Sequence, residues 1–254
     1  METTGSKLFK YRGQIPVIIF IAAIPILFVT PFNKLLCVNN YPNSPFCISA
    51  IIISAIITFL GLSLRAYTVC TTPKGTSGRN TSKQVADSLN TKGMYSVVRH
   101  PLYFANYLIW AGILVFTMNP FAFAIVSLVY WIYYERIMMT EEAFLRQKYG
   151  QEFEDWSQKV PAFFPKISIF QNGMLDFSLK TFIRREYATI LSTLVSFLIV
   201  DYLNRYIFDI QNGISTFQFF TPMFWITVVY IAIALIIKYL KHRTDVLKAD
   251  KNRD

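Results

Sequence analysis

The sequence GMYSVVRHPLYFANYLIWAGILVFTMNPFAFAIVSLVYWIYY occupies residues 93–134, and it decides how the rest of the chain is interpreted. Two apolar runs, 102–118 and 121–134, are separated by Asn119-Pro120. Because Asn-Pro favours a turn, we predict a helical hairpin. Each run is slightly short for a membrane span of about 20 residues, so both helices are expected to continue into polar flanks. The hairpin would return the block EEAFLRQKYGQEFEDWSQKVPAFFP, residues 141–165, to the membrane face where residues 93–101 lie.

The composition indicates a lipid environment. The 254 residues are 54% hydrophobic and 16% charged, against roughly 25% charged residues in soluble domains. The apolar residues also occur in blocks rather than at amphipathic spacing. We therefore predict an all-α integral membrane protein.

Six apolar segments are long enough to suggest membrane spans: 15–32, 46–66, 102–118, 121–134, 187–208 and 219–240. They divide the chain into a two-span scaffold (1–66), a catalytic core (67–166) and a two-span extension (167–254) to which no role is assigned beyond facing lipid or oligomerising. The core contains a polar stretch of 35 residues, 67–101, and such long loops are usually functional. Residues 140–159 are expected to form an amphipathic helix that breaks at Gly150.

The distribution of basic residues predicts the orientation. Lys and Arg number three in residues 1–14, six in 65–101, eight in 135–186 and six from 238 onward, so that only Lys34 and Arg205 fall on the other side. By the positive-inside rule both termini and both polar blocks are cytosolic, at an inner membrane if the source is bacterial. The net charge of +10 lies beside apolar spans rather than on a basic soluble domain, so we expect no nucleic-acid partner.

Cysteine and histidine usage says little about metals or redox state. With only His100 and His242 and no zinc-type cysteine spacing, no metal site is expected. Cys37 and Cys47 bracket a short loop, and either a disulfide or two ordinary thiols would suit them.

The two polar blocks carry the candidate chemistry. Arg99 and His100 precede Pro101, which favours a helix start, and a helix N-terminus binds anions. The alternative is that they only anchor the helix at the lipid headgroups. Glu141 and Glu142 arrive at the same membrane face, and ionisable groups there are costly unless paired or used. Tyrosine rings nearby attract cations. A ligand with a cation, a carboxylate and hydroxyls would match; S-adenosylmethionine is one of many such zwitterions.

The pattern G-x-Y-x-x-x-R-H-P-x-Y, from Gly93 to Tyr103, resembles the isoprenylcysteine carboxyl methyltransferase and phospholipid methyltransferase superfamily. The features that follow the helical hairpin in that superfamily occur here as Glu141-Glu142, Tyr149-Gly150, Phe153, Trp156 and Val160-Pro161. The resemblance covers roughly residues 60–166 and implies S-adenosylmethionine in a pocket at the cytosolic ends of the hairpin helices. By motif position the cofactor-binding residues would be Leu89, Asn90, Tyr95, His100, Pro101, Tyr103 and Glu141.

The resemblance also implies a membrane lipid or lipidated substrate, with Arg99, His100, Glu142 and Arg136 as the catalytic candidates. The isoprenylcysteine enzymes have a substrate-contacting Arg where this chain has Ile137, and the adjacent Arg136 would have to substitute for it. The loop upstream of Gly93 is also similar to bacterial lipid A 1-phosphate methyltransferases, with Arg79, Lys83 and Arg99 suited to a phosphate monoester.

We expect methyl transfer to an ionised carboxylate or phosphate oxygen, which needs no strong general base, so catalysis would be positioning and exclusion of water. An amine acceptor would need a base such as Glu142. A membrane lipid reductase using a nicotinamide cofactor is the other enzymatic alternative. A transporter or a non-catalytic adaptor would leave the co-occurrence of the two motifs unexplained.

Overall fold

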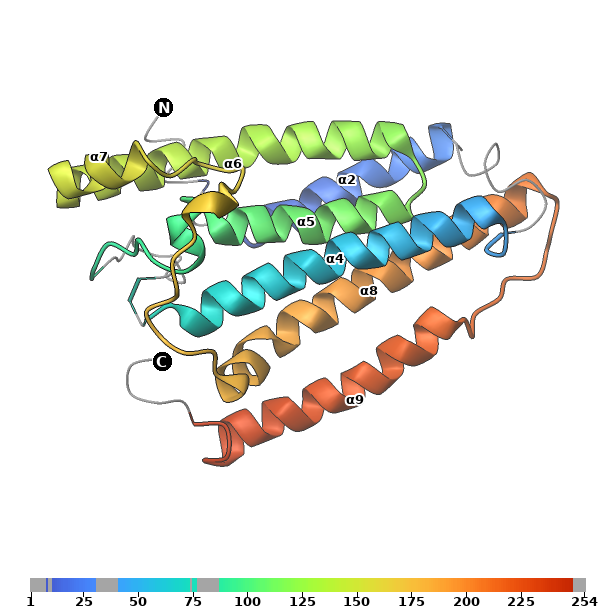
Figure 1. Ribbon diagram of the computed structural model, residues 1–254. Coiled ribbons are helices and arrows are strands. Elements are labelled where there is room, and N and C mark those ends of the chain that lie inside the picture. The colour runs from blue at the N-terminus through green and yellow to red at the C-terminus, as the bar shows by residue number, and fades with distance from the viewer. Residues whose placement is uncertain (1–7, 9–10, 31–40, 74, 77–86, 249–254) are drawn as a thin grey trace.

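The structure is a computed structural model that describes residues 8, 11–30, 41–73, 75–76 and 87–248. Its elements run in the order α2 (Ile15–Val29), α4 (Pro45–Thr71), the 3₁₀ turn η1 (Met94–Ser96), α5 (Pro101–Phe116), α6 (Pro120–Tyr149), α7 (Gln151–Ser157), the 3₁₀ turn η2 (Ile167–Ile169), α8 (Leu179–Gln211) and α9 (Pro222–Arg243). The long helices lie roughly side by side in one bundle, with α9 at its edge next to α8 (Figure 1). The described part contains helices and one isolated bridge, Gly93–Gln171, and no named strand. The expected all-α architecture is confirmed.

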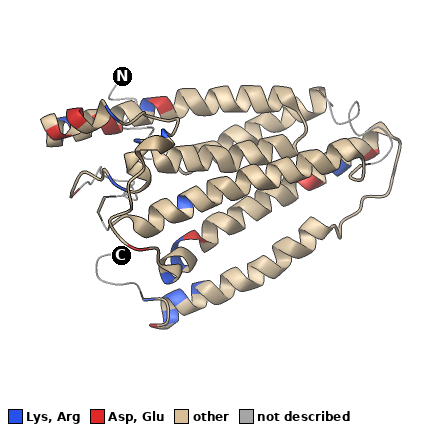
Figure 2. Cartoon of the chain, in the orientation of Figure 1, with Lys and Arg blue, Asp and Glu red and all other residues tan. Residues whose placement is uncertain are grey.

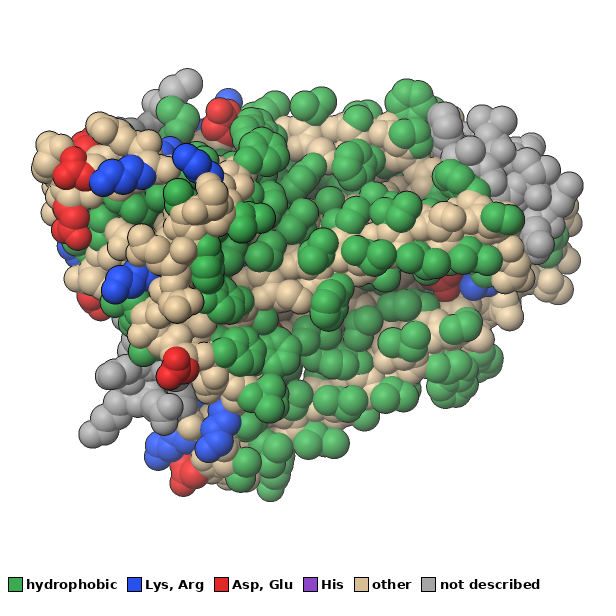
Figure 3. Space-filling model, viewed as in Figure 1, with side chains coloured by type: hydrophobic (Ala, Val, Ile, Leu, Met, Phe, Trp, Pro, Cys, Tyr) green, Lys and Arg blue, Asp and Glu red, His purple; other side chains and the backbone are tan. Residues whose placement is uncertain are grey.

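The bundle has the surface of a membrane protein. Four helices, α4, α6, α8 and α9, are long and apolar enough to cross a membrane, whereas α2 and α5 are shorter apolar helices. Hydrophobic side chains cover the middle of the visible face (Figure 3). Large ones such as Phe59 and Leu128 are 69% and 63% exposed, which suits lipid rather than water as solvent. Charged residues of the described chain gather mainly at one end (Figure 2).

Proline and small polar caps set where most helices begin. Pro45, Pro101, Pro120 and Pro222 stand in the first turn of their helices, where their missing N–H costs nothing. Asn119 confirms the predicted hairpin turn: its side chain accepts a hydrogen bond from the Ala122 N–H at 3.0 Å and donates one to the Thr30 carbonyl at 2.6 Å. The turn therefore also holds the end of α2 against the hairpin.

Two glycines allow α4 and α5 to pack closely. A Cβ added at Gly61 would lie 2.8 Å from the Ala105 carbonyl oxygen, and one at Gly112 would lie 2.7 Å from the Ser54 carbonyl oxygen. Close packing across small residues is a main source of helix association in lipid. This contact fixes α5, whose N-terminus carries the Arg-His-Pro motif.

Helix α8 is attached to the rest of the bundle by polar contacts. Arg65 of α4 donates from Nε to Glu186 of α8 at 2.7 Å and from Nη1 to Asn106 of α5 at 2.8 Å. At the other end of α5, Asn204 of α8 donates to the Phe116 carbonyl at 2.8 Å. Helix α8 is thus joined to α5 near both of its ends.

Several expected boundaries are corrected. Residues 140–159 are not a separate helix, because α6 continues without interruption to Tyr149; the expected break at Gly150, which has φ +52°, is confirmed. Helix α5 does not extend into its polar flanks: it begins at Pro101 and ends at Phe116. Conversely, α4 runs five residues past the expected span to Thr71, and the hydroxyls of Thr68 and Thr71 in this extension bond carbonyls one turn back. Helix α8 likewise begins at Leu179, before the apolar run.

Some predictions fall outside the described residues. These include Cys37, Lys34, and Arg79 and Lys83 of the polar loop. Cys47 is buried and disulfide-bonded, which decides between the two alternatives for that residue.

Candidate functional site

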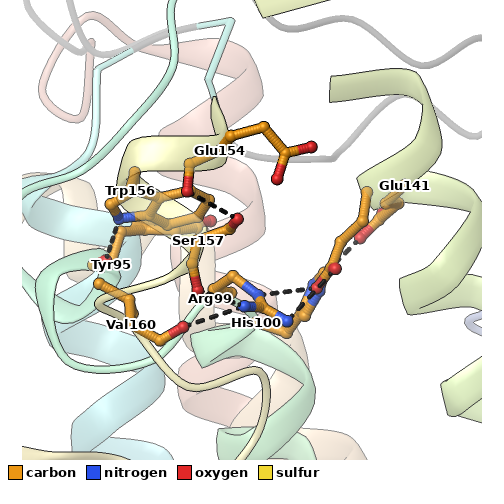
Figure 4. Close-up of polar contacts among 9 residues, drawn as sticks. Tyr95, Arg99, His100, Glu141, Glu154, Trp156, Ser157 and Val160 are labelled. Atoms are coloured by element: carbon orange, nitrogen blue, oxygen red, sulfur yellow. Dashed lines mark hydrogen bonds and ion pairs between the residues drawn. The ribbon is translucent and has the colours of Figure 1, made fainter. Parts of the chain in front are cut away.

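The two polar blocks meet where α5 begins and α6 leaves its apolar part. Arg99 and His100 precede α5, and both contact Glu142 of α6, 42 or more residues later in the chain. The side chains of Arg99 and His100 point toward this part of α6 (Figure 4). The expected juxtaposition of the Arg-His-Pro and Glu-Glu motifs is therefore present in the geometry.

Arg99 acts as a clamp in this structure. Its Nε and Nη2 donate to the two oxygens of Glu142 at 2.9 and 3.3 Å, and its Nη1 donates to the carbonyls of Ser157 and Val160 at 2.7 and 3.1 Å. Four of the five guanidinium N–H groups are thus used inside the protein. Arg99 joins the start of α5, the end of α6 and the chain that follows α7.

The backbone strengthens that junction. The Arg99 N–H donates to the Pro161 carbonyl at 2.9 Å, and the Lys166 N–H donates to the Val97 carbonyl at 2.9 Å. Trp156 of α7 donates from its ring nitrogen to the Tyr95 carbonyl at 3.1 Å, and the Tyr95 contact is visible in Figure 4. Residues 157–166 are therefore held alongside residues 95–100.

His100 lies between the two glutamates and is 6% exposed. Its Nε2 is 2.9 Å from Glu142 Oε1, and its Nδ1 is 3.5 Å from Glu141 Oε2. Burial opposes charging of the imidazole, but hydrogen bonds to Glu141 and Glu142 and their negative charges outweigh it, and the pKa of His100 is raised above its usual value. His100 is thus stabilised as a cation between two carboxylates.

Glu141 has more free acceptor capacity than Glu142. Tyr103 donates to Glu141 Oε1 at 2.7 Å, and Arg12 approaches the same oxygen at 3.4 Å. Oε2 is approached by His100 alone among the described residues, whereas a carboxylate has about four acceptor positions. Glu141 can therefore accept hydrogen bonds from a ligand without losing its protein partners.

Sequence reasoning missed Arg12. Tyr133 and Tyr134 of α6 donate to the carbonyls of Leu8 and Arg12 at 2.8 and 2.9 Å, which brings the N-terminal segment over the aromatic residues beside the site. Arg12 and Glu141 are 129 residues apart, and no local motif around Arg12 signals the contact.

Of the other predicted cofactor residues, Tyr95 and Pro101 lie next to this cluster in the chain, whereas no contact joins Leu89 or Asn90 to it within the described residues. Tyr95 lies four residues before Arg99, and burial, followed by the charge of Glu141, raises the pKa of its phenol. Pro101 is the buried first residue of α5, a helix that starts without a side-chain cap. Asn90 is buried and bonds Thr72 and the Lys92 N–H, and Leu89 is half-buried beside it.

Arg136 is not brought into the cluster. Its side chain is exposed on α6, while the adjacent Ile137 is fully buried in the aromatic core with Tyr103 and Tyr134. Arg136 and the glutamates lie on different faces of one helix, since five residues correspond to about 140° of rotation. The substrate-contacting role of Arg136 stays a prediction.

Comparison with known proteins gives partial but consistent matches. Residues 47–152 match the family described as phospholipid methyltransferase. A probable protein-S-isoprenylcysteine O-methyltransferase of Oryza sativa subsp. indica is 41% identical over 80 residues, which are 31% of this chain and 41% of that protein. The protein-S-isoprenylcysteine O-methyltransferase of Schizosaccharomyces pombe is 34% identical over 110 residues, which are 42% of this chain and 46% of that protein.

A protein named for metal resistance also matches part of this chain. The nickel-cobalt-cadmium resistance protein NccN of Alcaligenes xylosoxydans xylosoxydans is 33% identical over 96 residues, 38% of this chain and 42% of that protein. The chain thus spans less than half the length of the relatives it matches, and no solved structure matches it significantly. The matched segment 47–152 contains both the Arg-His-Pro motif and the glutamate pair, and it is similar to the phospholipid methyltransferase family and to isoprenylcysteine O-methyltransferases.

Proposed function

We propose that this protein is an integral-membrane methyltransferase that uses S-adenosylmethionine to methylate an anionic oxygen, phosphate or carboxylate, of a lipid or lipidated substrate in the bilayer. The observation that carries the proposal is the contact of Arg99 and His100 with Glu142, and of His100 and Tyr103 with Glu141. These contacts join the two motifs that distinguish the superfamily, and the named relatives include isoprenylcysteine O-methyltransferases.

The residues present fit the cofactor. Glu141 would accept hydrogen bonds from ribose hydroxyls or an ammonium group, because its Oε2 has spare acceptor capacity. The uncapped N-terminus of α5 at Pro101 would face the carboxylate with free backbone N–H groups. The rings of Tyr95 and Tyr103 would face the cationic centre, and the Leu89-Asn90 segment would contribute to the same pocket. When bound, S-adenosylmethionine supplies an electrophilic methyl group.

The state of the charged side chains favours an acceptor that is already ionised. A general base must have its proton-accepting group within reach of the substrate. Here both oxygens of Glu142 are held by Arg99, and one is also held by His100. A phosphate or carboxylate oxygen needs no such base, so the protein's task is to orient the acceptor and exclude water.

The partly exposed edge of the aromatic core, at Tyr107 and Trp110, would supply an apolar surface for the acceptor's hydrocarbon part. Tyr103, Tyr130, Tyr133 and Tyr134 pack together next to Glu141, with Tyr107 and Trp110 at the edge of the cluster. A narrow crevice between α2, α5 and α6 is lined by Pro16, Trp110, Ser127 and Tyr130, among others. A lipid chain lying along this surface would bring its polar end to the level of the glutamates.

An amine acceptor is the second candidate, because the matched family is described as phospholipid methyltransferase. This alternative requires Glu142 or another group to take up a proton, which the Arg99 clamp opposes. A lipid reductase using a nicotinamide cofactor is the remaining alternative and is distinguished by the cofactor it binds.

We also propose that the six apolar helices, α2, α4, α5, α6, α8 and α9, cross the membrane with both termini in the cytosol. The concentration of charged residues at the site end of the bundle supports this orientation (Figure 2). The division into a scaffold (1–66), a catalytic core (67–166) and an extension (167–254) is part of the proposal. Arg12 shows that the scaffold also contributes a side chain beside the core glutamates.

Transfer of a labelled methyl group tests the proposal. Membranes containing the protein, incubated with methyl-labelled S-adenosylmethionine, should form a labelled lipid or lipidated product. If the acceptor is a carboxylate, the label should be released by alkali as methanol, whereas a methyl phosphodiester formed from a phosphate monoester would resist alkali and be identified by phosphorus NMR. Alkali-stable label in an amine-containing lipid would instead favour N-methylation. If membranes with the wild-type protein formed no more labelled product than membranes with the Glu141→Gln protein, the proposed activity would be contradicted.

A further inference from the structure

A polar cavity lies at the end of the bundle away from the Arg99–Glu142 site. It has a volume of about 480 Å³ and its lining includes Tyr41, Arg205, Phe208, Asp209, Phe217 and Gln218. Asn204, one residue from Arg205, bonds the Phe116 carbonyl at the C-terminus of α5, whereas the site surrounds the N-terminus of that helix. The two places are therefore separated by roughly 24 Å, the length of a 16-residue helix.

Three charged residues of α8 line or adjoin this cavity, one per helical turn. Asp201 and Arg205 form a pair, with Arg205 Nε 3.1 and 3.2 Å from the two oxygens of Asp201. Arg205 Nη1 donates to Gln218 at 3.0 Å, and the guanidinium lies over the ring of Tyr41. The pair is nearly buried, with side chains 12% and 6% exposed. Arg205 is thus held rigidly, and its Nη2 has no partner among the described residues.

Asp209 is the third charge, and no protein group forms an ion pair with it within the described chain. It lines the same cavity and is half-buried. It lies one turn beyond Arg205 on the same helix face, yet the two do not come within the 4 Å of an ion pair, unlike Asp201 and Arg205. An anionic group and a cationic group thus border one cavity without touching each other. Ionisable groups at a membrane boundary are costly unless paired or used.

The surroundings place the cavity at the membrane surface. The segment that borders it continues into an aromatic cluster in which Phe219 packs on Tyr202, Phe220 and Phe224. Trp225 is 55% exposed beside them, and aromatic residues of this kind gather at the headgroup level of bilayers. Acidic and basic side chains are visible at this end, recessed among hydrophobic ones (Figure 3).

We propose that this cavity binds the zwitterionic headgroup of an aminophospholipid in the leaflet opposite the methyltransferase site. The phosphate would accept a hydrogen bond from Arg205 Nη2, and the ammonium group would pair with Asp209. A phosphoethanolamine group carries its two charges a few ångströms apart, as the separated Arg205 and Asp209 require. The location at the membrane surface selects a lipid headgroup over the same zwitterion free in solution. The ligand does not depend on the proposed methyl transfer.

Lipid binding to the purified protein tests this proposal. Detergent-solubilised protein is titrated with dioleoylphosphatidylethanolamine, dioleoylphosphatidylglycerol or glycerophosphoethanolamine, and bound lipid is counted by native mass spectrometry. We expect phosphatidylethanolamine to bind most tightly, and Asp209→Asn to weaken its binding about ten-fold, the worth of one charge-assisted hydrogen bond. Phosphatidylglycerol, which lacks the cation, should be unaffected by the substitution. Asp245→Asn is the matched control, because that carboxylate is 89% exposed beside Lys248.

Several results would contradict the proposed binding of a lipid headgroup. Equal binding of the two phospholipids, or unchanged binding of phosphatidylethanolamine by Asp209→Asn, would overturn the headgroup assignment. Binding of glycerophosphoethanolamine as tight as that of the lipid would overturn the choice of a lipid over a soluble ligand. Among the described residues Asp209 makes no ion pair whose loss would impair folding, so the melting temperature of Asp209→Asn without added lipid should match that of the wild type.

Discussion

The two adjacent glutamates have different surroundings, and this difference predicts different roles. Glu142 is fully engaged by Arg99 and His100, whereas Glu141 shares one oxygen with Tyr103 and Arg12 and keeps capacity on the other. We infer that Glu142 holds the site together and that Glu141 receives the ligand.

The pair Glu141→Gln and Glu142→Gln separates these roles. Glu141→Gln retains an acceptor for Tyr103 but removes one of the two carboxylates beside His100, so we expect a smaller loss of stability than for Glu142→Gln and a cofactor affinity lowered by about 10- to 100-fold, the worth of a hydrogen bond to a charged group. Glu142→Gln leaves Arg99 without its carboxylate, so the melting temperature should fall clearly. Calorimetric binding and thermal unfolding measure the two effects. Equal behaviour of the two variants in both measurements would contradict the assignment.

His100 predicts a dependence of stability on pH. Its raised pKa means that the charged imidazole stabilises the fold, fully below the ordinary pKa of about 6.5 and progressively less as the pH rises through the raised value. The groups around it are Glu141, Glu142, Arg99 and Arg12, with the ring of Tyr103 stacked on the imidazole. The melting temperature should therefore fall above neutral pH, and His100→Gln should flatten that fall. If the melting temperatures of the wild type and of His100→Gln changed with pH in the same way, this would argue against a charged His100.

The sequence predicted the meeting of Arg99, His100, Glu141 and Glu142 because the motifs are local and the hairpin returns one to the other. It did not predict Arg12 or the carbonyls of Ser157 and Val160 as partners. Backbone acceptors have no side-chain signature, and the Arg12 contact depends on how the N-terminal segment lies across α6.

At the scale of helices, the packing of α4 on α5 fixes where the Arg-His-Pro motif stands. Gly112→Ala would place a Cβ 2.7 Å from the Ser54 carbonyl oxygen and 2.0 Å from the Thr58 hydroxyl. Backbone would have to shift, at a cost of about 1–3 kcal/mol for overpacking. Gly13→Ala is the control, since its Cβ would meet nothing within 4 Å. Thermal unfolding in detergent should show a loss for Gly112→Ala only; equal melting temperatures would refute the close contact.

The attachment of α8 makes a second prediction at this scale. Glu186 is 2% exposed at its side chain and bonds Arg65, so Glu186→Gln should destabilise the protein by about 3 kcal/mol, as expected for a broken buried pair. The double variant Arg65→Met with Glu186→Leu should be less destabilised than Glu186→Gln, because no unpaired charge remains. If the losses of stability caused by the separate substitutions simply added in the double variant, Arg65 and Glu186 would not be coupled.

Helix existence followed from the apolar runs, but helix ends did not. The apolar run ends at Tyr134, whereas α6 continues to Tyr149 because hydrogen bonding continues through polar residues until Gly150. The expected spans mark the part of a helix that lipid would surround, and hydropathy alone does not report the turns beyond it.

For the molecule as a whole, we predict that the two ends of the bundle lie on opposite sides of the membrane. A cysteine introduced at Asp245, near the site end, should be protected from an impermeant maleimide in intact cells, whereas one at Gly213 should be labelled. The protein without the new cysteine gives the background. Labelling of the Asp245 position in intact cells would contradict cytosolic termini.

The most direct test of the proposed methyltransferase site is calorimetric titration of the detergent-purified protein with S-adenosylmethionine and S-adenosylhomocysteine. We predict that the wild type and Asp245→Ala bind both compounds saturably. Binding should be lost in His100→Ala and in Glu141→Ala. Titration with nicotinamide cofactors should give no signal. A folded wild-type protein that binds neither S-adenosyl compound, or variants that bind both as tightly as the wild type, would contradict the methyltransferase site.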